Sequence, residues 1–192
     1  HPEVEGTMGR HTGGEASTIY LVQDEFDAKS IKINQPNNVA LVTQTTLSVD
    51  DTKVITDELK SRFPQLITPK NDDICYATQN RQDAVKQLAL ENEFMIVVGS
   101  KNSSNSNRLK ELSDRCGCEA ILIDEFSDLD LSKINNIKKI AITAGASAPE
   151  IRVQEIAQEL KKYTGGIINE VGKDEENIVF KMPPELRIEQ AQ

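Results

Sequence analysis

The stretch Phe94-Met-Ile-Val-Val-Gly-Ser-Lys-Asn-Ser-Ser-Asn-Ser-Asn107 decides the fold class of this 192-residue chain. Its first five residues form an apolar run that is typical of a buried strand. A loop rich in serine and asparagine follows, and a helix is predicted from about Asn107 to Arg115. The same order of strand, polar loop and helix recurs along the chain, and this alternation predicts an α/β fold with parallel sheets.

Four further short apolar runs predict strands, at residues 18–22, 39–42, 120–123 and 139–143. Two more helices are predicted to begin at the N-caps Ser48 and Thr78. A last helix is predicted to begin at Ser147-Ala-Pro-Glu150, which fits a capping box with proline in the first turn, and to end at Gly165. The pattern indicates one unit that closes by about residue 72 and a second that begins near residue 73.

The composition argues against two classes of function. Acidic residues outnumber basic residues by 31 to 22, giving a formal net charge of −9, whereas general nucleic-acid binding depends on a basic surface. No run of about 18 apolar residues occurs, so no membrane span is predicted. Three cysteines without an export signal indicate a reducing, cytoplasmic setting. A phosphorylated small molecule is compatible with the acidic charge, because a few local donors suffice to hold it.

Two loops rich in hydrogen-bond donors follow predicted strands. Residues 99–107 contain four serines and three asparagines, and hydroxyl, amide and helix-start N–H groups together suit a phosphate. The loop Ala144-Gly-Ala-Ser-Ala148 repeats this arrangement after the strand at 139–143. For the first loop a solvated linker is an equally open alternative. For the second, taken alone, a simple helix cap is the default interpretation. In parallel sheets ligands gather at the carboxyl ends of strands, so the two loops can face one pocket.

Four other polar features each carry a chemical and a simpler interpretation. Thr43-Gln-Thr-Thr46 offers hydroxyl donors to a substrate, or is an ordinary turn after a strand. His1-Pro-Glu3 offers an acid–base pair, or is a solvated chain end. Cys75, just before a predicted helix, suits a metal ligand or a nucleophile, or is a buried structural thiol. The pair Cys116 and Cys118 lacks the second pair that a zinc site needs, and predicts a plain helix end with buried thiols.

Taken in order, these motifs resemble those of the 4-hydroxy-3-methylbut-2-enyl diphosphate reductase family, which catalyses the last step of the non-mevalonate isoprenoid pathway. The resemblance extends from the first residue to the Pro-Pro-Glu-Leu-Arg motif at 183–187. Five motifs carry it: HPEVEGT at 1–7, TQTTLS at 43–48, CYATQN at 75–80, VGSKNSSNSN at 98–107 and TAGASAPE at 143–150.

The resemblance implies a three-lobed fold of related small α/β domains around a [4Fe-4S] cluster. The chain then corresponds to the second lobe (1–72), the third lobe (73–165) and a C-terminal tail (166–192) that packs on another part of the molecule, and the first lobe is expected upstream. In the family three cysteines, one per lobe, hold the cluster. Cys75 matches the ligand motif of the third lobe, whereas Cys116 and Cys118 match none.

The resemblance also implies the roles of individual residues. The substrate hydroxyl binds the open iron, and electrons reach the cluster from a donor such as ferredoxin or flavodoxin. The C–O bond then breaks with loss of water, and the allylic anion is protonated. Glu3 and Thr45 are expected to deliver this proton. The residues expected to bind the substrate are His1, Thr45, Ser103, Ser104, Asn105 and Ser147. The alternative function is that of a cluster-free, non-catalytic phosphate-binding module that lacks the first lobe.

Overall fold

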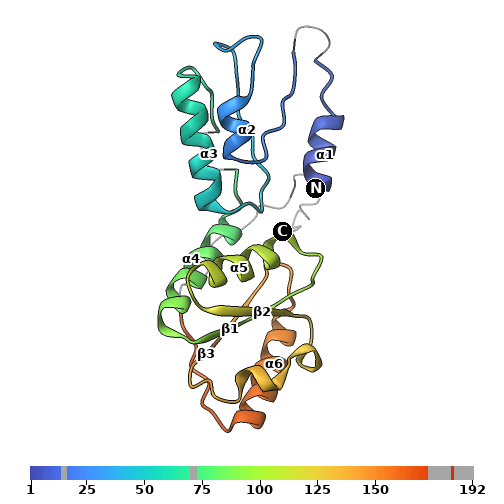
Figure 1. Ribbon diagram of the computed structural model, residues 1–192. Coiled ribbons are helices and arrows are strands. Elements are labelled where there is room, and N and C mark those ends of the chain that lie inside the picture. Colours follow the sequence, from blue (N-terminus) through green and yellow to red (C-terminus); the bar gives the residue numbers. More distant parts are fainter. Residues whose placement is uncertain (14–16, 70–72, 173–182, 184–192) are drawn as a thin grey trace, which may run out of the picture.

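A computed structural model describes residues 1–13, 17–69, 73–172 and 183 of the chain. The described residues form two halves that follow one another along the long axis of the molecule (Figure 1). The first half contains α1 (Pro2–Gly9), α2 (Glu25–Ser30) and α3 (Val49–Arg62), which surround extended segments. The second half contains a parallel sheet with helices on both faces.

The sheet of the second half has three parallel strands in the order β2-β1-β3. They are β1 (Phe94–Val98), β2 (Glu119–Ile123) and β3 (Ile140–Ala144). All five residues of the central strand β1 are buried, which is why its sequence is a continuous apolar run. The α/β fold class and the three strands predicted here are therefore confirmed, with ends that agree to within one residue.

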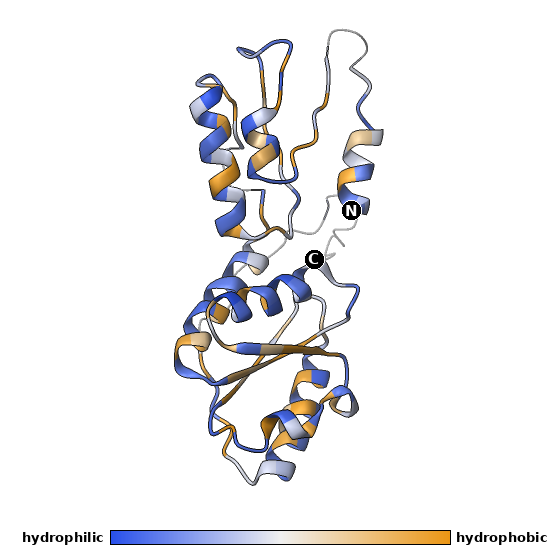
Figure 2. Cartoon of the chain, in the orientation of Figure 1, coloured by the Kyte–Doolittle hydropathy of each residue, from blue (hydrophilic) through white to orange (hydrophobic). Residues whose placement is uncertain are grey.

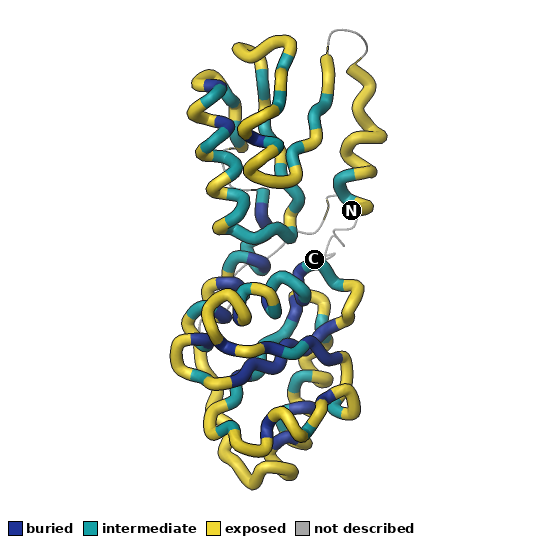
Figure 3. The backbone as a smooth tube through the Cα atoms, in the orientation of Figure 1, coloured by how far each residue is buried: buried dark blue, intermediate teal, exposed yellow. Residues whose placement is uncertain are grey.

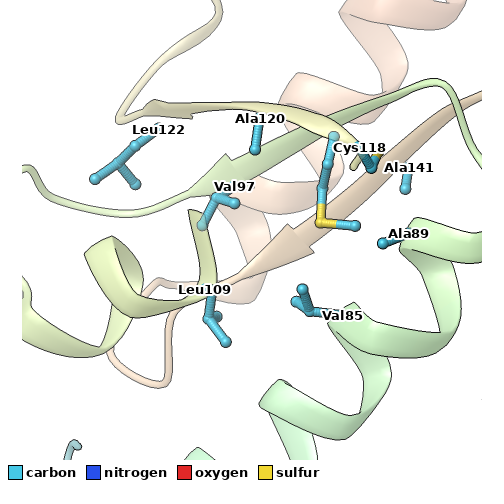
Figure 4. Packing of buried hydrophobic residues seen from close by; sticks show 9 residues of the cluster. Val85, Ala89, Val97, Leu109, Cys118, Ala120, Leu122 and Ala141 are labelled. Carbon is cyan, nitrogen blue, oxygen red and sulfur yellow. The ribbon is translucent and has the colours of Figure 1, made fainter. Parts of the chain in front are cut away.

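Successive side chains of β1 alternate between two apolar clusters, one on each face of the sheet. Met95 and Val97 face α4 (Tyr76–Glu91) and α5 (Ser104–Arg115). Figure 4 shows the side chains of this cluster gathered between the strands and these two helices. Phe94, Ile96 and Val98 pack on the other face, where the helical partners lie in α6 (Glu150–Thr164) and in the short 3-10 turns Phe126–Asp128 and Leu131–Ile134. The alternation fixes the register of β1 between the two helical layers.

Three helix starts differ from their predictions. Helix α4 begins earlier, with Cys75 as its N-cap, so Thr78 lies buried in the first turn and the prediction of Thr78 as N-cap is wrong. Helix α5 begins at Ser104 instead of about residue 107, because the Ser103 hydroxyl accepts a hydrogen bond from the N–H of Ser106 at 3.2 Å. The capping box predicted at the start of α6 does not form. Pro149 is instead the N-cap, with a ψ of 133° outside the helical range, so α6 starts at Glu150 and the proline does not lie in its first turn.

Other helix ends agree with the sequence. The Ser48 side chain accepts a hydrogen bond from the N–H of Asp51 and caps α3, as predicted. Gly165 ends α6 with φ +68°, a left-handed conformation that glycine adopts without a steric penalty. Beyond it, the described side chains of Ile167, Ile168 and Val171 are exposed. Most of the predicted C-terminal tail lies outside the described residues.

The predicted strands at 18–22 and 39–42 do not form a sheet among the described residues. Both segments are extended, but the first has no strand pairing and the second has only an isolated parallel bridge between Ala40 and Ile67. A strand needs a neighbour for its N–H and C=O groups, and the described part of the first half supplies almost none. The core of this half is correspondingly small, with Ala28, Leu59 and Phe63 as its buried residues.

Burial and hydropathy both differ between the two halves. Figure 3 shows buried backbone concentrated in the sheet and only scattered through the first half. Figure 2 shows apolar residues along the strands, with polar residues on the outward side of the covering helices. None of the helices in the described ranges is long and apolar enough to cross a membrane.

Candidate functional site

The residues between Thr43 and Ser48 form the junction between the two halves. The N–H of Thr43 donates to the Asp73 carboxylate at 2.7 Å, and the N–H of Cys75 donates to the carbonyl of Thr45 at 3.0 Å. This segment therefore joins the first half to the start of α4. The N-terminus of the chain lies beside the same junction (Figure 1).

Glu3 and Thr45 are in direct contact, although 42 residues separate them. One carboxylate oxygen of Glu3 accepts the N–H of Thr45 at 3.1 Å, and the other accepts its hydroxyl at 3.2 Å. The Glu3 carbonyl also accepts the hydroxyl of Thr7 at 2.9 Å. Thr45 is exposed, and the half-buried Glu3 lines a cavity, so its carboxylate is accessible to a bound molecule. These contacts fix a carboxyl group against a hydroxyl group, which is the arrangement needed to pass a proton.

His1 lies next to Glu3 at the start of α1. Its Nδ1 atom accepts the N–H of Glu3 at 3.3 Å and so caps the helix. The imidazole is exposed, and its Nε2 atom has no partner among the described residues. The structure therefore places His1 beside the proposed acid and leaves one ring nitrogen available to a ligand.

The start of α5 brings three predicted site residues together. Ser103 is the N-cap, and Ser104 and Asn105 are the first two helical residues. The hydroxyl of Ser104 contacts Thr46 at 3.1 Å and Gln44 at 3.4 Å, which joins this helix start to the junction segment. N–H groups at a helix start are free and favour an anion. The site thus combines backbone and side-chain donors that suit a phosphate.

Asn105 is only 5% exposed, and both polar atoms of its amide lack a hydrogen-bond partner. A buried amide without partners is costly, by about 1–3 kcal/mol for each unsatisfied group. Such an amide is stabilised when a ligand group pairs with it. Of the predicted phosphate-binding side chains, Asn105 therefore shows the clearest structural sign of a ligand-binding role.

Ser147 lies on the loop between β3 and α6. It is exposed. Gly145 of the same loop lies against Ser106 of α5, so the loop approaches the start of that helix. Arg81 of α4 donates from Nε to the carbonyl of Ala144 at 3.2 Å, which places a cation at this strand end. The two donor-rich loops therefore lie close together at one edge of the sheet.

The three cysteines have different environments. Cys75 is exposed at the start of α4, so the simpler interpretation of a buried thiol does not apply to it. Cys116 is exposed at the end of α5 and Cys118 is buried, so only one of the two thiols predicted to be buried is so. Burial raises the pKa of the Cys118 thiol. Within the described residues, no group of three or more His, Cys, Asp or Glu side chains could hold a metal ion.

A cavity of about 860 Å³ lies in the first half, between α1, α3 and the extended segments. Its polar lining includes His1, Glu3 and Gln44, and much of the remainder is apolar. Cys75, Asn105 and Ser147 do not line it. Of the predicted site residues, only His1 and Glu3 line this cavity.

Two residues near the junction were missed by the sequence reasoning, Gln82 and Ser106. Gln82 of α4 bonds to Val49 and to Leu47. Ser106 packs against glycines that follow two different strands. A glycine at or just beyond the end of each of two predicted strands was the available sign that another element approaches closely there.

Comparison with known proteins gives concordant matches. Residues 1–161 match the family described as LytB protein. Proteins named 4-hydroxy-3-methylbut-2-enyl diphosphate reductase in Saccharophagus degradans and Pseudomonas putida are 54% and 53% identical over 188 residues. Each match covers 98% of this chain and 60% of the relative. The chain thus spans about 60% of the length of these curated relatives.

One solved structure is also similar to the chain. It is the E-1-hydroxy-2-methyl-but-2-enyl-4-diphosphate reductase of Plasmodium falciparum, with a TM-score of 0.79 and 34% sequence identity. The match covers 86% of this chain and 53% of that protein. The arrangement of the described elements is therefore shared with a homologous enzyme.

Proposed function

Because the chain belongs to the LytB protein family, we propose that it is part of a 4-hydroxy-3-methylbut-2-enyl diphosphate reductase. The observation that carries the proposal is the junction, where the Glu3–Thr45 pair, Cys75 and the start of α5 are joined by hydrogen bonds. The identity of about 54% to proteins of that name supports it.

The proposed reaction replaces a hydroxyl group of the substrate by hydrogen. Two electrons enter, the allylic C–O bond breaks, and the oxygen leaves as water after taking up one proton. A second proton forms the new C–H bond and gives isopentenyl or dimethylallyl diphosphate. The electrons come from an external donor, for which we propose a ferredoxin or a flavodoxin. The protein must therefore deliver protons at one end of the substrate and bind the diphosphate at the other.

Glu3 is the proposed proton donor, and Thr45 the hydroxyl that orients it and relays the proton. Two hydrogen bonds from Thr45 fix the position of the Glu3 carboxyl group. A carboxyl group that is held in place beside a hydroxyl group is positioned to act as a general acid.

The start of α5 and the loop after β3 form the proposed diphosphate site. Ser103, Ser104 and Asn105 supply hydroxyl and amide donors at the positive end of the helix dipole, and Ser147 adds a hydroxyl from the facing loop. His1 completes the set from α1. Hydrogen bonds to a charged oxygen are stronger than those between neutral groups, so a few of them offset the desolvation of the diphosphate.

A [4Fe-4S] cluster is the cofactor that we propose for the whole enzyme, where it would supply electrons and a Lewis acid for the departing oxygen. A single matching thiol cannot hold a cluster alone, and the described residues contain no group of three or more side chains that could hold a metal ion. We assign Cys75 as one ligand, because it is exposed and bonded through its N–H to the junction. The remaining ligands lie outside this set of residues.

The proposal includes the division of the chain at about residues 72 and 165 and a cytoplasmic location. The cluster-free phosphate-binding module is the less favoured alternative, because the junction contains an acid pair that simple phosphate binding does not require. The test is anaerobic turnover by the whole protein with its cluster and a chemical reductant. We expect 4-hydroxy-3-methylbut-2-enyl diphosphate to be converted to the two isoprenoid diphosphates. Tight binding of the substrate without any conversion would favour the module instead.

A further inference from the structure

Gly99 and Gly145 occupy equivalent positions at the carboxyl ends of two neighbouring strands. Val98 and Ala144 are the last residues of β1 and β3 and pair with each other. The residue that follows each of these strands is a glycine, so the two glycines lie side by side at the sheet edge. The N–H of Gly145 donates to the carbonyl of Val98 at 2.9 Å, which holds the two strand ends together. Each glycine also precedes one of the two loops that we assign to diphosphate binding.

Ser106 of α5 packs directly onto both glycines. A Cβ atom added to Gly99 or to Gly145 would overlap the Ser106 Oγ atom, and it would lie 3.0 Å and 3.3 Å, respectively, from the Ser106 Cβ atom. Ser106 is completely buried. The start of α5 therefore approaches the sheet more closely than any side chain at position 99 or 145 would allow.

The Ser106 hydroxyl makes no hydrogen bond in the described structure. Its size, and not its polarity, therefore decides the contact. Because Ser106 follows Asn105 directly and Gly145 lies two residues before Ser147, this contact sets the spacing between the donors of the two loops. We call this packing of Ser106 on Gly99 and Gly145 the Gly–Ser–Gly contact.

We propose that Ser106, Gly99 and Gly145 are positioning residues that set the width of the diphosphate site by holding the start of α5 against the loop after β3. The inference rests on the proposed function and names residues that do not themselves touch the substrate. It requires that a methyl group on Gly145 move the loops apart and weaken diphosphate binding. It also requires that removal of the Ser106 Oγ atom restore the room for that methyl group.

The experiment measures the affinity of the 192-residue chain for inorganic diphosphate by calorimetry, together with the midpoint of thermal unfolding. Gly145→Ala should raise Kd at least about tenfold. Ser106→Ala alone should raise Kd by a smaller factor, below about threefold, because the Ser106 Cβ atom that packs on the two glycines remains. In the double variant the closest remaining contact with Ser106 is the Cβ–Cβ contact of 3.3 Å, so Kd should return to within about threefold of the unsubstituted value. Gly9→Ala is the control, because nothing lies within 4 Å of a Cβ atom there.

The outcomes separate this inference from the proposed function. Normal affinity in Gly145→Ala, or a double variant as weak as Gly145→Ala, would overturn the inference alone. Absence of diphosphate binding by the unsubstituted chain would overturn the proposed site and the inference with it. If Gly145→Ala does not fold, Ser106→Thr enlarges the other side of the same contact by one methyl group. It should weaken binding similarly, and normal affinity in that variant would also refute the proposal.

Discussion

Replacement of Gln82 by leucine should destabilise the contact between the two halves. Gln82 of α4 is 2% exposed, and its amide makes two hydrogen bonds to the first half. Its Oε1 atom accepts the N–H of Val49 at 3.0 Å, and its Nε2 atom donates to the carbonyl of Leu47 at 2.9 Å. Leucine has a similar volume but neither donor nor acceptor. The substitution therefore leaves two main-chain groups without their partner.

The magnitude follows from these two groups. A hydrogen bond contributes about 1 kcal/mol net, but an unpaired buried partner costs about 1–3 kcal/mol. The apolar surface that leucine buries offsets part of this loss, so we expect the free energy of unfolding to fall by about 2–4 kcal/mol. With a urea m-value of about 2 kcal/mol per M, the unfolding midpoint should fall by about 1–2 M.

Urea unfolding followed by far-UV circular dichroism measures this effect. Gln87→Leu is the matched control, since Gln87 lies on the exposed side of the same helix. It should change the free energy of unfolding by less than about 0.5 kcal/mol. Equal midpoints for the Gln82→Leu variant and the unsubstituted chain would show that the two hydrogen bonds do not hold the halves together.

Three further predictions concern the cysteines and the phosphate donors. A thiol reagent at pH 8 should modify the exposed Cys75 and Cys116 quickly and Cys118 only on unfolding. Burial raises the pKa of Cys118, so less of its thiolate is present at that pH. Equal rates for all three cysteines would contradict this. Cys75→Ser should abolish iron incorporation in the whole enzyme, as measured by iron content, whereas Cys116→Ser and Cys118→Ser should retain it. Asn105→Ala and Ser147→Ala should each weaken diphosphate binding by about 1–3 kcal/mol in calorimetric titration. Ser127→Ala, at an exposed position, is the control. Unchanged affinity in both the Asn105 and the Ser147 variant would identify the loops as linkers.

The strands of the second half could be predicted because the residues of each strand identify it without reference to its neighbours. The run at 94–98 is apolar throughout and is followed by a glycine, so only a fully buried strand fits it. The same reasoning failed at 18–22 and 39–42, where equally strand-like residues are extended without a sheet. Whether such a segment forms a sheet depends on a neighbouring strand, and residue type does not reveal that neighbour.

The candidate site was predictable only in part. Serine and asparagine after a strand indicated the start of α5, but the earlier helix start at Ser104 depends on the cap at Ser103. The pairing of Glu3 with Thr45 spans 42 residues and follows from the family resemblance, since no spacing rule predicts it. The Gly–Ser–Gly contact depends on three elements that meet in space, and its members are among the least distinctive residues of the sequence.

Turnover of the whole enzyme with Glu3→Gln tests the central claim most directly. Glutamine can still accept the N–H of Thr45 and contact its hydroxyl, but it carries no transferable proton. We expect kcat to fall by about 10²–10⁴-fold while substrate still binds. Glu5→Gln, an exposed neighbour on the same helix, should change turnover by less than about twofold. Turnover of Glu3→Gln within about twofold of the unsubstituted enzyme would contradict the account.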